Sequence, residues 1–160
     1  MDFDISLVAT EGEVFFGSTK EGSFGIRVAG TMKQTSGGTI KNSRGGLGAA
    51  ECWGKPAEWI DYYGPVDGKV VGVTIMDHPE SFRHPTHWHI RDYGLFAANP
   101  FGHRHFYGKE AAGKGDYRLQ KGQSIRFKYR LYIHHGSTVK SRVERVYAGF
   151  SSPPLLHLKR

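Results

Sequence analysis

One stretch in the last third of the chain alternates strictly between apolar and mostly charged side chains: Ile125-Arg126-Phe127-Lys128-Tyr129-Arg130-Leu131-Tyr132-Ile133. Successive side chains of a β-strand point to opposite sides of a sheet. The odd-numbered residues of this stretch therefore share one side, and the even-numbered residues share the other. We predict a long strand with one side against a core and the other side against solvent.

Outside this stretch, the same period of two recurs along the chain. It is seen in Phe3–Leu7 and in Ser23–Ala29, while Val70–Met76 is apolar on both sides and indicates a central strand. Shorter strands are expected at Val14–Phe16, Thr39–Asn42, Trp59–Tyr63, His89–Arg91, Leu95–Ala98 and Tyr117–Gln120. Glycine-rich turns separate these segments, which is typical of an antiparallel sandwich or barrel.

A single convincing helix is expected near the end of the chain. One helical stripe contains Val139, Val143, Val146, Tyr147 and Phe150. Ser137 or Thr138 would cap its start, and Pro153-Pro154 would prevent its continuation. The sequence thus predicts a mainly β protein, an antiparallel β-sandwich with one C-terminal α-helix, formed by residues 1–160 as a single domain.

Composition narrows the class of protein. The 160 residues contain no apolar run long enough for a membrane helix, and the amino terminus lacks the basic region of a signal peptide. A cytoplasmic protein with no membrane partner is the default expectation. The lone Cys52 allows no disulfide within the chain and is expected to be a buried thiol. The net charge of +7 suits an anionic partner or serves solubility alone.

Two glycine-containing segments fail as nucleotide-binding motifs. Gly46-Leu47-Gly48 lacks the third glycine of a dinucleotide fingerprint, and no helix is expected after it. Gly54-Lys55 is followed by Pro56, so the hydroxyl that a phosphate-binding loop uses for magnesium is missing. These departures do not favour a nucleotide enzyme, and no cofactor is predicted.

Six of the nine histidines lie between residues 78 and 105, and they leave two chemical interpretations open. His87 and His89 would point to one side of a strand with His84 nearby, which is a candidate metal site. Alternatively, His78 and His89 have carboxylates and guanidinium groups beside them in sequence, which suits proton transfer near neutral pH. Either histidine could instead be a hydrogen-bonded support beneath a loop.

Aromatic and polar residues together suggest a sugar ligand. Sugar rings bind by stacking an apolar face on an aromatic plate, while charged and amide groups hold the hydroxyls. Trp53, Trp59 and Trp88 are the candidate plates, and the candidate polar groups are Lys20, Arg27, Arg91 and Asn99. Core packing is the competing role for any one of these tryptophans.

Several longer strings resemble a bacterial family labelled "methane oxygenase PmoA-like". They are Thr19–Arg27, Trp53–Lys55, Trp59–Tyr62, Asp77–Pro79 and Trp88–Gly102, and the resemblance extends from about Phe3 to Phe150. It implies a β-rich protein from bacteria that degrade complex glycans. Members of that family usually extend further at the amino terminus, so the chain resembles the carboxy-terminal part of the family domain. A homodimer is expected if exposed sheet edges pair or if another chain completes the site.

These observations lead to the hypothesis of a carbohydrate-active protein that binds a sugar or sugar derivative in a pocket lined by His, Arg and Trp, where acid–base catalysis of the mutarotase type could follow. Glu21 would be the base, His89 the acid, Arg91 a group that binds hydroxyls and His78 a supporting residue. One alternative is a non-catalytic glycan-binding module that uses the same aromatic plate, and another is a metal enzyme built on His84, His87 and His89.

A further alternative is a binder of nucleic acid or acidic glycan along a basic stripe, with nucleic acid the less favoured partner. The residues of this stripe are Arg126, Lys128, Arg130, Lys140, Arg142 and Arg145.

Overall fold

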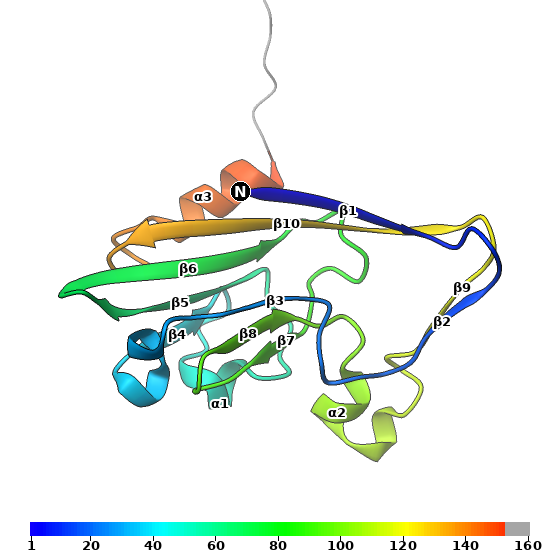
Figure 1. Ribbon diagram of the computed structural model, residues 1–160, viewed down its shortest axis with the longest axis horizontal. Helices are drawn as coiled ribbons and strands as arrows, with labels where there is room; N and C mark the ends of the chain where they lie inside the picture. Colours follow the sequence, from blue (N-terminus) through cyan, green and yellow to red (C-terminus); the bar gives the residue numbers. More distant parts are fainter. Residues whose placement is uncertain (153–160) are drawn as a thin grey trace, which may run out of the picture.

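The computed structural model describes residues 1–152, and its strands form three antiparallel sheets (Figure 1). The largest sheet has the strand order β1 (Asp2–Val8), β10 (Ser124–His135), β6 (Lys69–Asp77), β5 (Trp59–Val66) and β4 (Thr39–Asn42). The second has the order β3 (Phe24–Arg27), β8 (Leu95–Ala98) and β7 (Trp88–Ile90). The third is a ribbon of β2 (Val14–Phe16) and β9 (Tyr117–Leu119) at one end of the molecule.

Strand β10 organises the largest sheet. Its first half pairs with β1 and its second half pairs with β6, so the strand predicted from the alternating stretch is confirmed and is longer than expected. Ile125, Phe127, Tyr129 and Leu131 are buried as their spacing predicts. Ile133 is 63% exposed, so the buried side of the strand ends at Leu131.

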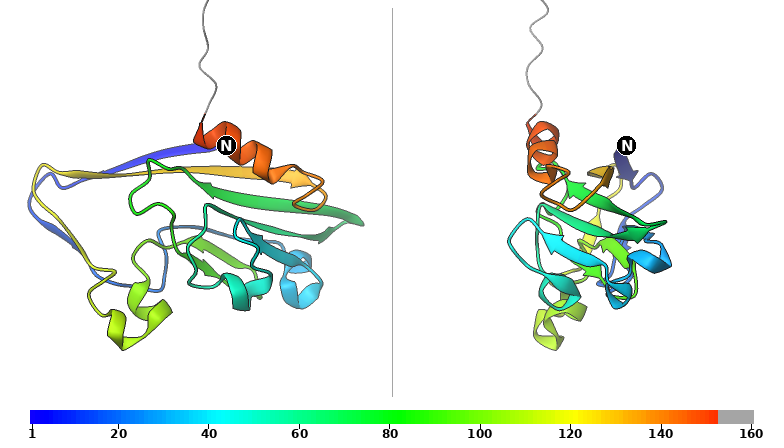
Figure 2. Two further views of the ribbon diagram at one scale, coloured as in Figure 1. Left: turned by 180° about the vertical axis from the view of Figure 1, so that it is seen from behind. Right: turned by 90° about the vertical axis from the view of Figure 1, so that its left-hand side faces the viewer.

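The five-stranded and three-stranded sheets face each other, and their inner sides form the main core (Figures 1 and 2). Ile60 and Ile75 come from the first sheet, and Trp88, Ile90 and Phe96 come from the second, all fully buried. Burial of such large apolar side chains is the main driving force for the association of two sheets. The predicted mainly β sandwich is confirmed.

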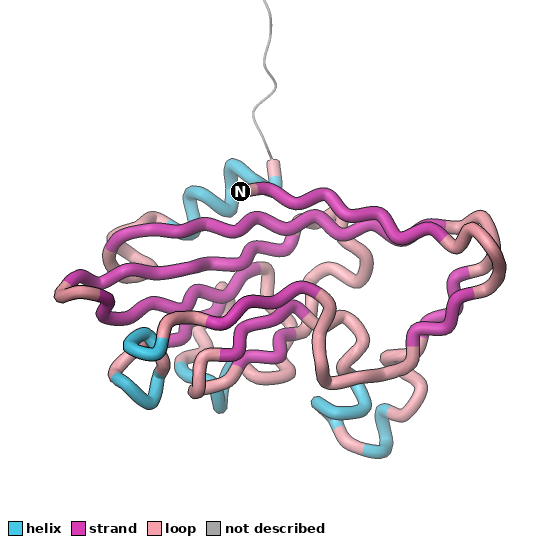
Figure 3. Tube along the Cα trace, in the orientation of Figure 1, coloured by secondary structure: helices cyan, strands magenta, loops and turns pink. Residues whose placement is uncertain are grey.

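Short helical segments lie in the connections between strands (Figure 3). The two short α-helices are α1 (Gly48–Cys52) and α2 (His103–Tyr107), and the 3-10 turns are η1 (Gly30–Met32), η2 (Gln34–Ser36) and η3 (Lys109–Ala111). Each is too brief to show a clear helical period in the sequence. Cys52 ends α1 and is fully buried, and burial, followed by the nearby Glu51 carboxylate, raises the pKa of its thiol to about 12.

The C-terminal helix α3 (Val143–Ser151) covers the outer side of the five-stranded sheet, where Val143 and Phe150 pack against Trp59 and Met76. Its existence is confirmed, but the predicted start is wrong. Val139 is 77% exposed and lies outside the helix.

Neither Ser137 nor Thr138 caps the helix; the cap position belongs to Arg142. The Thr138 hydroxyl instead donates to the buried Oδ2 of Asp61 at 2.6 Å. The predicted stop at Pro153-Pro154 lies outside the described residues. None of the helices within residues 1–152 has the length and apolar character that crossing a membrane requires.

Candidate functional site

The three-stranded sheet collects several of the predicted polar residues on its outer side. In the pairing of β3, β8 and β7, Gly25, Ala97 and His89 form one row across the sheet. Arg27 pairs with Leu95 in the next row, and the backbone N–H of Arg91 donates to Leu95 O at 2.9 Å. Because residues two apart share a side of a strand, Arg27, Arg91 and His89 lie on one face, where Arg27 is exposed, Arg91 is half-buried and His89 is only 3% exposed. We call this the open face.

The loop that precedes β3 crosses the open face and brings Lys20 and Glu21 to it. His89 Nδ1 is hydrogen-bonded to the backbone oxygen of Lys20. A Cβ added at Gly25 would lie 2.7 Å from the Ala97 Cβ, so this row of the sheet has no space for a larger side chain. The Lys20 and Glu21 side chains are exposed.

The hydrogen bonds of His89 define its tautomer. Arg91 Nε donates to His89 Nε2 at 3.2 Å, so Nε2 accepts and Nδ1 carries the proton that goes to Lys20 O. Burial lowers the pKa of His89; the Arg91 charge lowers it further, while the Lys20 backbone oxygen and the Glu21 carboxylate act in the opposite direction. His89 is therefore a neutral imidazole with both nitrogens engaged.

Arg91 lies between this imidazole and a tryptophan. Its guanidinium carbon is 4.9 Å from the centre of the Trp53 ring, within the range of a cation–π contact. Trp53 in turn packs edge-on against Phe106 of α2 at 5.2 Å. Within residues 1–152, the Arg91 guanidinium donates one hydrogen bond, and its acceptor is His89. Its two terminal nitrogens donate no hydrogen bond within these residues, and the side chain is half-buried.

Asn99 lies behind the loop and does not form part of a polar wall. It is fully buried, and its Nδ2 donates to Thr19 O at 2.8 Å while its Oδ1 accepts from the Phe101 N–H at 3.0 Å. The predicted contact with a ligand is therefore corrected to a supporting role. Asn99 anchors the loop that presents Lys20 and Glu21.

Two of the three predicted aromatic plates are also corrected. Trp88 is fully buried between the sheets, and its Nε1 donates to Ala57 O at 2.9 Å. Trp59 is 1% exposed beneath α3. Both tryptophans are large and apolar and pack in hydrophobic cores, which is the competing role considered in the sequence analysis. Trp53 is the tryptophan that reaches the open face.

His78 is far from His89 in the architecture. It follows β6 on the outer side of the five-stranded sheet, where its ring packs edge-on against Phe150 of α3 at 4.9 Å. Its Nδ1 accepts from the Glu80 backbone N–H at 3.1 Å. The expected grouping of His78 with the other candidates does not occur, because the main core separates the two outer sides.

The three histidines of the metal alternative also diverge. His84 Nδ1 is 2.9 Å from the buried Oδ2 of Asp77, and His87 Nε2 is 3.1 Å from the Tyr107 hydroxyl. His89 is held by Lys20 and Arg91 as described above. No group of three or more metal-binding side chains forms in the described part of the chain. The spacing in sequence did not produce convergence, because His84 and His87 in the loop before β7 and His89 within β7 each bind a different partner.

The basic stripe on β10 is paired with carboxylates of this chain. Arg126 binds Asp4, Lys128 binds Glu80, and Arg130 binds Asp2. We call this outer side of the five-stranded sheet the paired face. Since neighbouring acids already neutralise these three cations, the β10 part of the stripe offers little of the surplus positive charge that a nucleic acid or acidic glycan needs. The other three members of the stripe, Lys140, Arg142 and Arg145, form no ion pair within residues 1–152.

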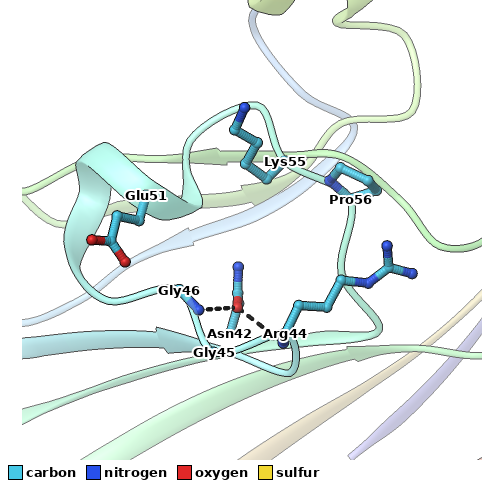
Figure 4. Close-up of a pocket in the computed structure, with 7 residues that line it drawn as sticks. All are labelled: Asn42, Arg44, Gly45, Gly46, Glu51, Lys55 and Pro56. Atoms are coloured by element: carbon cyan, nitrogen blue, oxygen red, sulfur yellow. Dashed lines mark hydrogen bonds between the residues drawn. The ribbon is translucent and has the colours of Figure 1, made fainter.

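A hollow beside α1, of about 460 Å³, is shown in Figure 4 and is lined by Asn42, Arg44, Gly45, Gly46, Glu51, Lys55 and Pro56. Its polar side chains are mostly occupied locally. Asn42 Oδ1 accepts from the backbone N–H groups of Arg44 and Gly46, and the Arg44 guanidinium pairs with Glu58 at 2.8 Å. The hollow therefore has few free groups with which to hold a ligand.

Sequence reasoning missed two buried carboxylate–histidine pairs. Asp61 Oδ1 is 2.8 Å from His134 Nε2 and accepts from the Thr74 hydroxyl at 3.0 Å. Asp77 Oδ2 contacts His84 and also accepts from the Thr86 N–H at 2.9 Å. A carboxylate within an otherwise apolar strand was the signal that could have indicated each pair, because a buried charge requires partners.

Comparison with known proteins gives a family but no activity. Residues 1–148 match the model of a family of unknown function, DUF6807. No curated protein and no solved structure matches the chain. The PmoA-like label stays a prediction that none of these comparisons tests. Because the match spans more than nine-tenths of the 160 residues, the chain belongs to the DUF6807 family.

Proposed function

We propose that this protein binds a carbohydrate on the open face. Arg91 and Arg27 would donate to sugar oxygens, Glu21 would accept from hydroxyls, and Trp53 would provide an aromatic edge beside the sugar ring. Lys20 would add a further donor from the loop. This combination of charged fork, carboxylate and indole is suited to a polyhydroxylated ligand.

The arrangement of Arg91 is the observation that carries the proposal. Its guanidinium is held against Trp53 at 4.9 Å and donates from Nε to His89 at 3.2 Å. A side chain that is already ordered loses less conformational entropy when a ligand binds. A purely structural arginine would be expected to use its terminal nitrogens within the chain, as Arg83 does with the backbone oxygens of Pro100, Gly115 and Asp116.

Binding without turnover fits the geometry better than mutarotase-type catalysis. An acid at His89 would need a proton on Nε2 directed at the sugar, but Nε2 accepts from Arg91. The lowered pKa of His89 also disfavours its charged, proton-donating form near neutral pH. Catalysis would require Arg91 to release the imidazole.

The test is a binding measurement with a panel of neutral and acidic mono- and oligosaccharides, followed by nuclear magnetic resonance of the protein amides. We expect shifts at Lys20, Glu21 and Arg91, and loss of binding in Arg91→Met and Trp53→Ala. Arg126→Met on the paired face is the matched control and should bind as the wild type does. The proposal fails if no saccharide at millimolar concentration shifts open-face amides.

Polarimetry with glucose and galactose anomers separates the catalytic alternative. The binding interpretation predicts that the wild type does not accelerate mutarotation. Acceleration that disappears in both Glu21→Gln and His89→Ala would restore the catalytic interpretation in place of simple binding.

The expected homodimer stays a prediction. Strands β1 and β4 form the two edges of the five-stranded sheet, and such edges can pair with another chain. Light scattering at several protein concentrations would measure the mass of the particle directly. A monomer mass throughout would remove the expectation.

A further inference from the structure

We infer that the carbohydrate bound on the open face carries a carboxylate, which makes it an acidic saccharide of the uronate class. This inference rests on the proposed function and narrows its ligand. Three features support it: the surplus of positive charge on the open face, the terminal nitrogens of Arg91, and the ion pairs that neutralise the cations of the paired face.

Within the described part of the chain, the cations of the open face differ from Arg126, Lys128 and Arg130 of the paired face in having no carboxylate partner. Within residues 1–152, Arg44, Arg118, Arg126, Lys128 and Arg130 each form an ion pair with a carboxylate of the chain. Over the same residues, no such pair forms at Lys20, Arg27 or Arg91. A neutral sugar requires no compensation of charge, whereas an anionic sugar does.

Positive charge also exceeds negative charge on this face. Arg27 and Arg91 lie on either side of Leu95, and Lys20 is exposed on the loop beside them. Glu21 and Asp92 are the carboxylates closest to them in the chain. Both Glu21 and Asp92 are exposed. Three cations against two acids leave a surplus that one carboxylate of a ligand would balance.

The geometry of Arg91 favours a planar anion. Its Nε is already committed to His89, so the two terminal nitrogens form the remaining donor edge. Two parallel N–H donors match the two oxygens of a carboxylate in a fork-to-fork pair. The indole of Trp53 on one side limits rotation of the guanidinium plane. A lysine at this position would supply the charge without the fixed direction.

Arg27 provides a second contact for the same ligand. Its guanidinium carbon is 5.8 Å from the centre of the Tyr93 ring, so it too is backed by an aromatic side chain. Two intervals between neighbouring strands separate the backbones of Arg27 and Arg91, which is roughly 10 Å. The two guanidinium groups can therefore hold different groups of one saccharide, the carboxylate at Arg91 and hydroxyls at Arg27.

The experiment compares glucose, glucuronate and glucose 6-phosphate by calorimetry or ligand titration at low ionic strength. We expect glucuronate to bind about tenfold or more tightly than glucose, since hydrogen bonds to charged groups are worth more than neutral ones. Added salt should weaken glucuronate binding more than glucose binding. Short galacturonate oligomers, tested beside the monomer, distinguish a polymer as the source from a free acid sugar.

Substitutions on the two faces test which side chain causes the preference for glucuronate over glucose. Arg91→Lys should keep charge attraction but lose most of the preference for glucuronate, and Arg91→Gln should lose it entirely. Arg27→Gln should weaken both sugars to a similar degree. Arg126→Gln, on the paired face, should leave both affinities as in the wild type. Thermal unfolding of each variant shows whether the fold is retained.

Failure of the uronate inference can be told apart from failure of carbohydrate binding as such. Equal affinity for glucose and glucuronate overturns the inference and leaves carbohydrate binding standing. Tighter binding of glucose 6-phosphate than of glucuronate overturns the assignment of a carboxylate. Absence of binding by all of these sugars and oligomers overturns the inference together with the proposed function.

Discussion

The outer sides of the two sheets differ in how they treat positive charge. On the paired face, Arg126, Lys128 and Arg130 each bind a carboxylate from β1 or from the turn after β6. On the open face, Arg27 and Arg91 lie against aromatic rings, and no ion pair involves either of them within residues 1–152. Counting cations alone would point to the paired face as the surface that binds a ligand. The comparison teaches that the availability of a charge, more than its presence, marks a surface that can bind a ligand.

The largest effect on stability is expected from removing the buried carboxylate beneath the paired face. Asp61 is fully buried and bonds to Thr74, His134 and Thr138. Asp61→Ala should lower the free energy of unfolding by about 3–5 kcal/mol, because it leaves buried polar partners without an acceptor. Urea denaturation measures the loss. A change below about 1 kcal/mol would contradict the role given to this network.

A smaller expected effect concerns the space that His134 needs. A Cβ added at Gly72 would lie 2.9 Å from the Tyr63 Cβ and would overlap the His134 ring. Gly72→Ala should therefore displace that ring and cost about 1–3 kcal/mol, as is usual for overpacking. Gly68→Ala should not be used as its control, since Gly68 has a positive φ of 73°. Gly12→Ala, at a position without a positive φ where the added Cβ meets nothing within 4 Å, is suitable. Equal stability of Gly72→Ala and wild type would show that His134 moves freely.

The region beside the open face should make stability depend on pH. Burial, with smaller effects of His103 and Arg83, lowers the pKa of His87 to about 4. An unfolded histidine titrates near about 6.5, so between these values the unfolded chain binds more protons than the folded chain. The free energy of unfolding should then be greatest above the upper value and fall as the pH decreases toward the lower one.

Unfolding in urea at several pH values between these limits measures the slope. His87→Gln should reduce the slope, while the exposed His105→Gln should leave it nearly unchanged. The window lies mostly above the range in which Glu58 titrates, whose pKa is lowered to about 2 by Arg44. A slope that does not respond to His87→Gln would assign the effect to other groups.

The smallest expected effects compare single cations on the two faces. Asp2 and Arg130 are both partly exposed, so a double-mutant cycle with Asp2→Asn and Arg130→Gln should give a coupling of at most about 1 kcal/mol that shrinks in salt. Arg27→Gln should change the free energy of unfolding by no more than about 0.5 kcal/mol. A larger loss at Arg27 than at Arg130 would reverse the distinction between the faces.

Periodicity predicted most of the strands but could not assign the two outer sides. Val14–Phe16, Thr39–Asn42 and Leu95–Ala98 are strands with the predicted bounds, because glycine and polar turns delimit each one. The start of α3 was missed since Thr138 satisfies Asp61, a residue distant in sequence. Local patterns carry no information on such a contact.

The candidate site was predictable in part for the same reason. His89 and Arg91 are two residues apart on one strand, and their shared side follows from the sequence. The separation of His78 from them depends on β6 and β7 joining different sheets with the main core between them. The use of Trp59 and Trp88 in cores depends on how the sheets pack. Neither is encoded in the spacing of the residues themselves.

The burial of Cys52 gives this chain a reporter of its own opening. The thiol is fully buried and its pKa is raised to about 12, so the folded protein presents almost no thiolate to an alkylating reagent. With one cysteine in the sequence, labelling yields a single mass increment that cannot be confused with a second site. The rate of that increment would therefore time how often the segment around α1 comes apart, under conditions in which the bulk of the sample stays native.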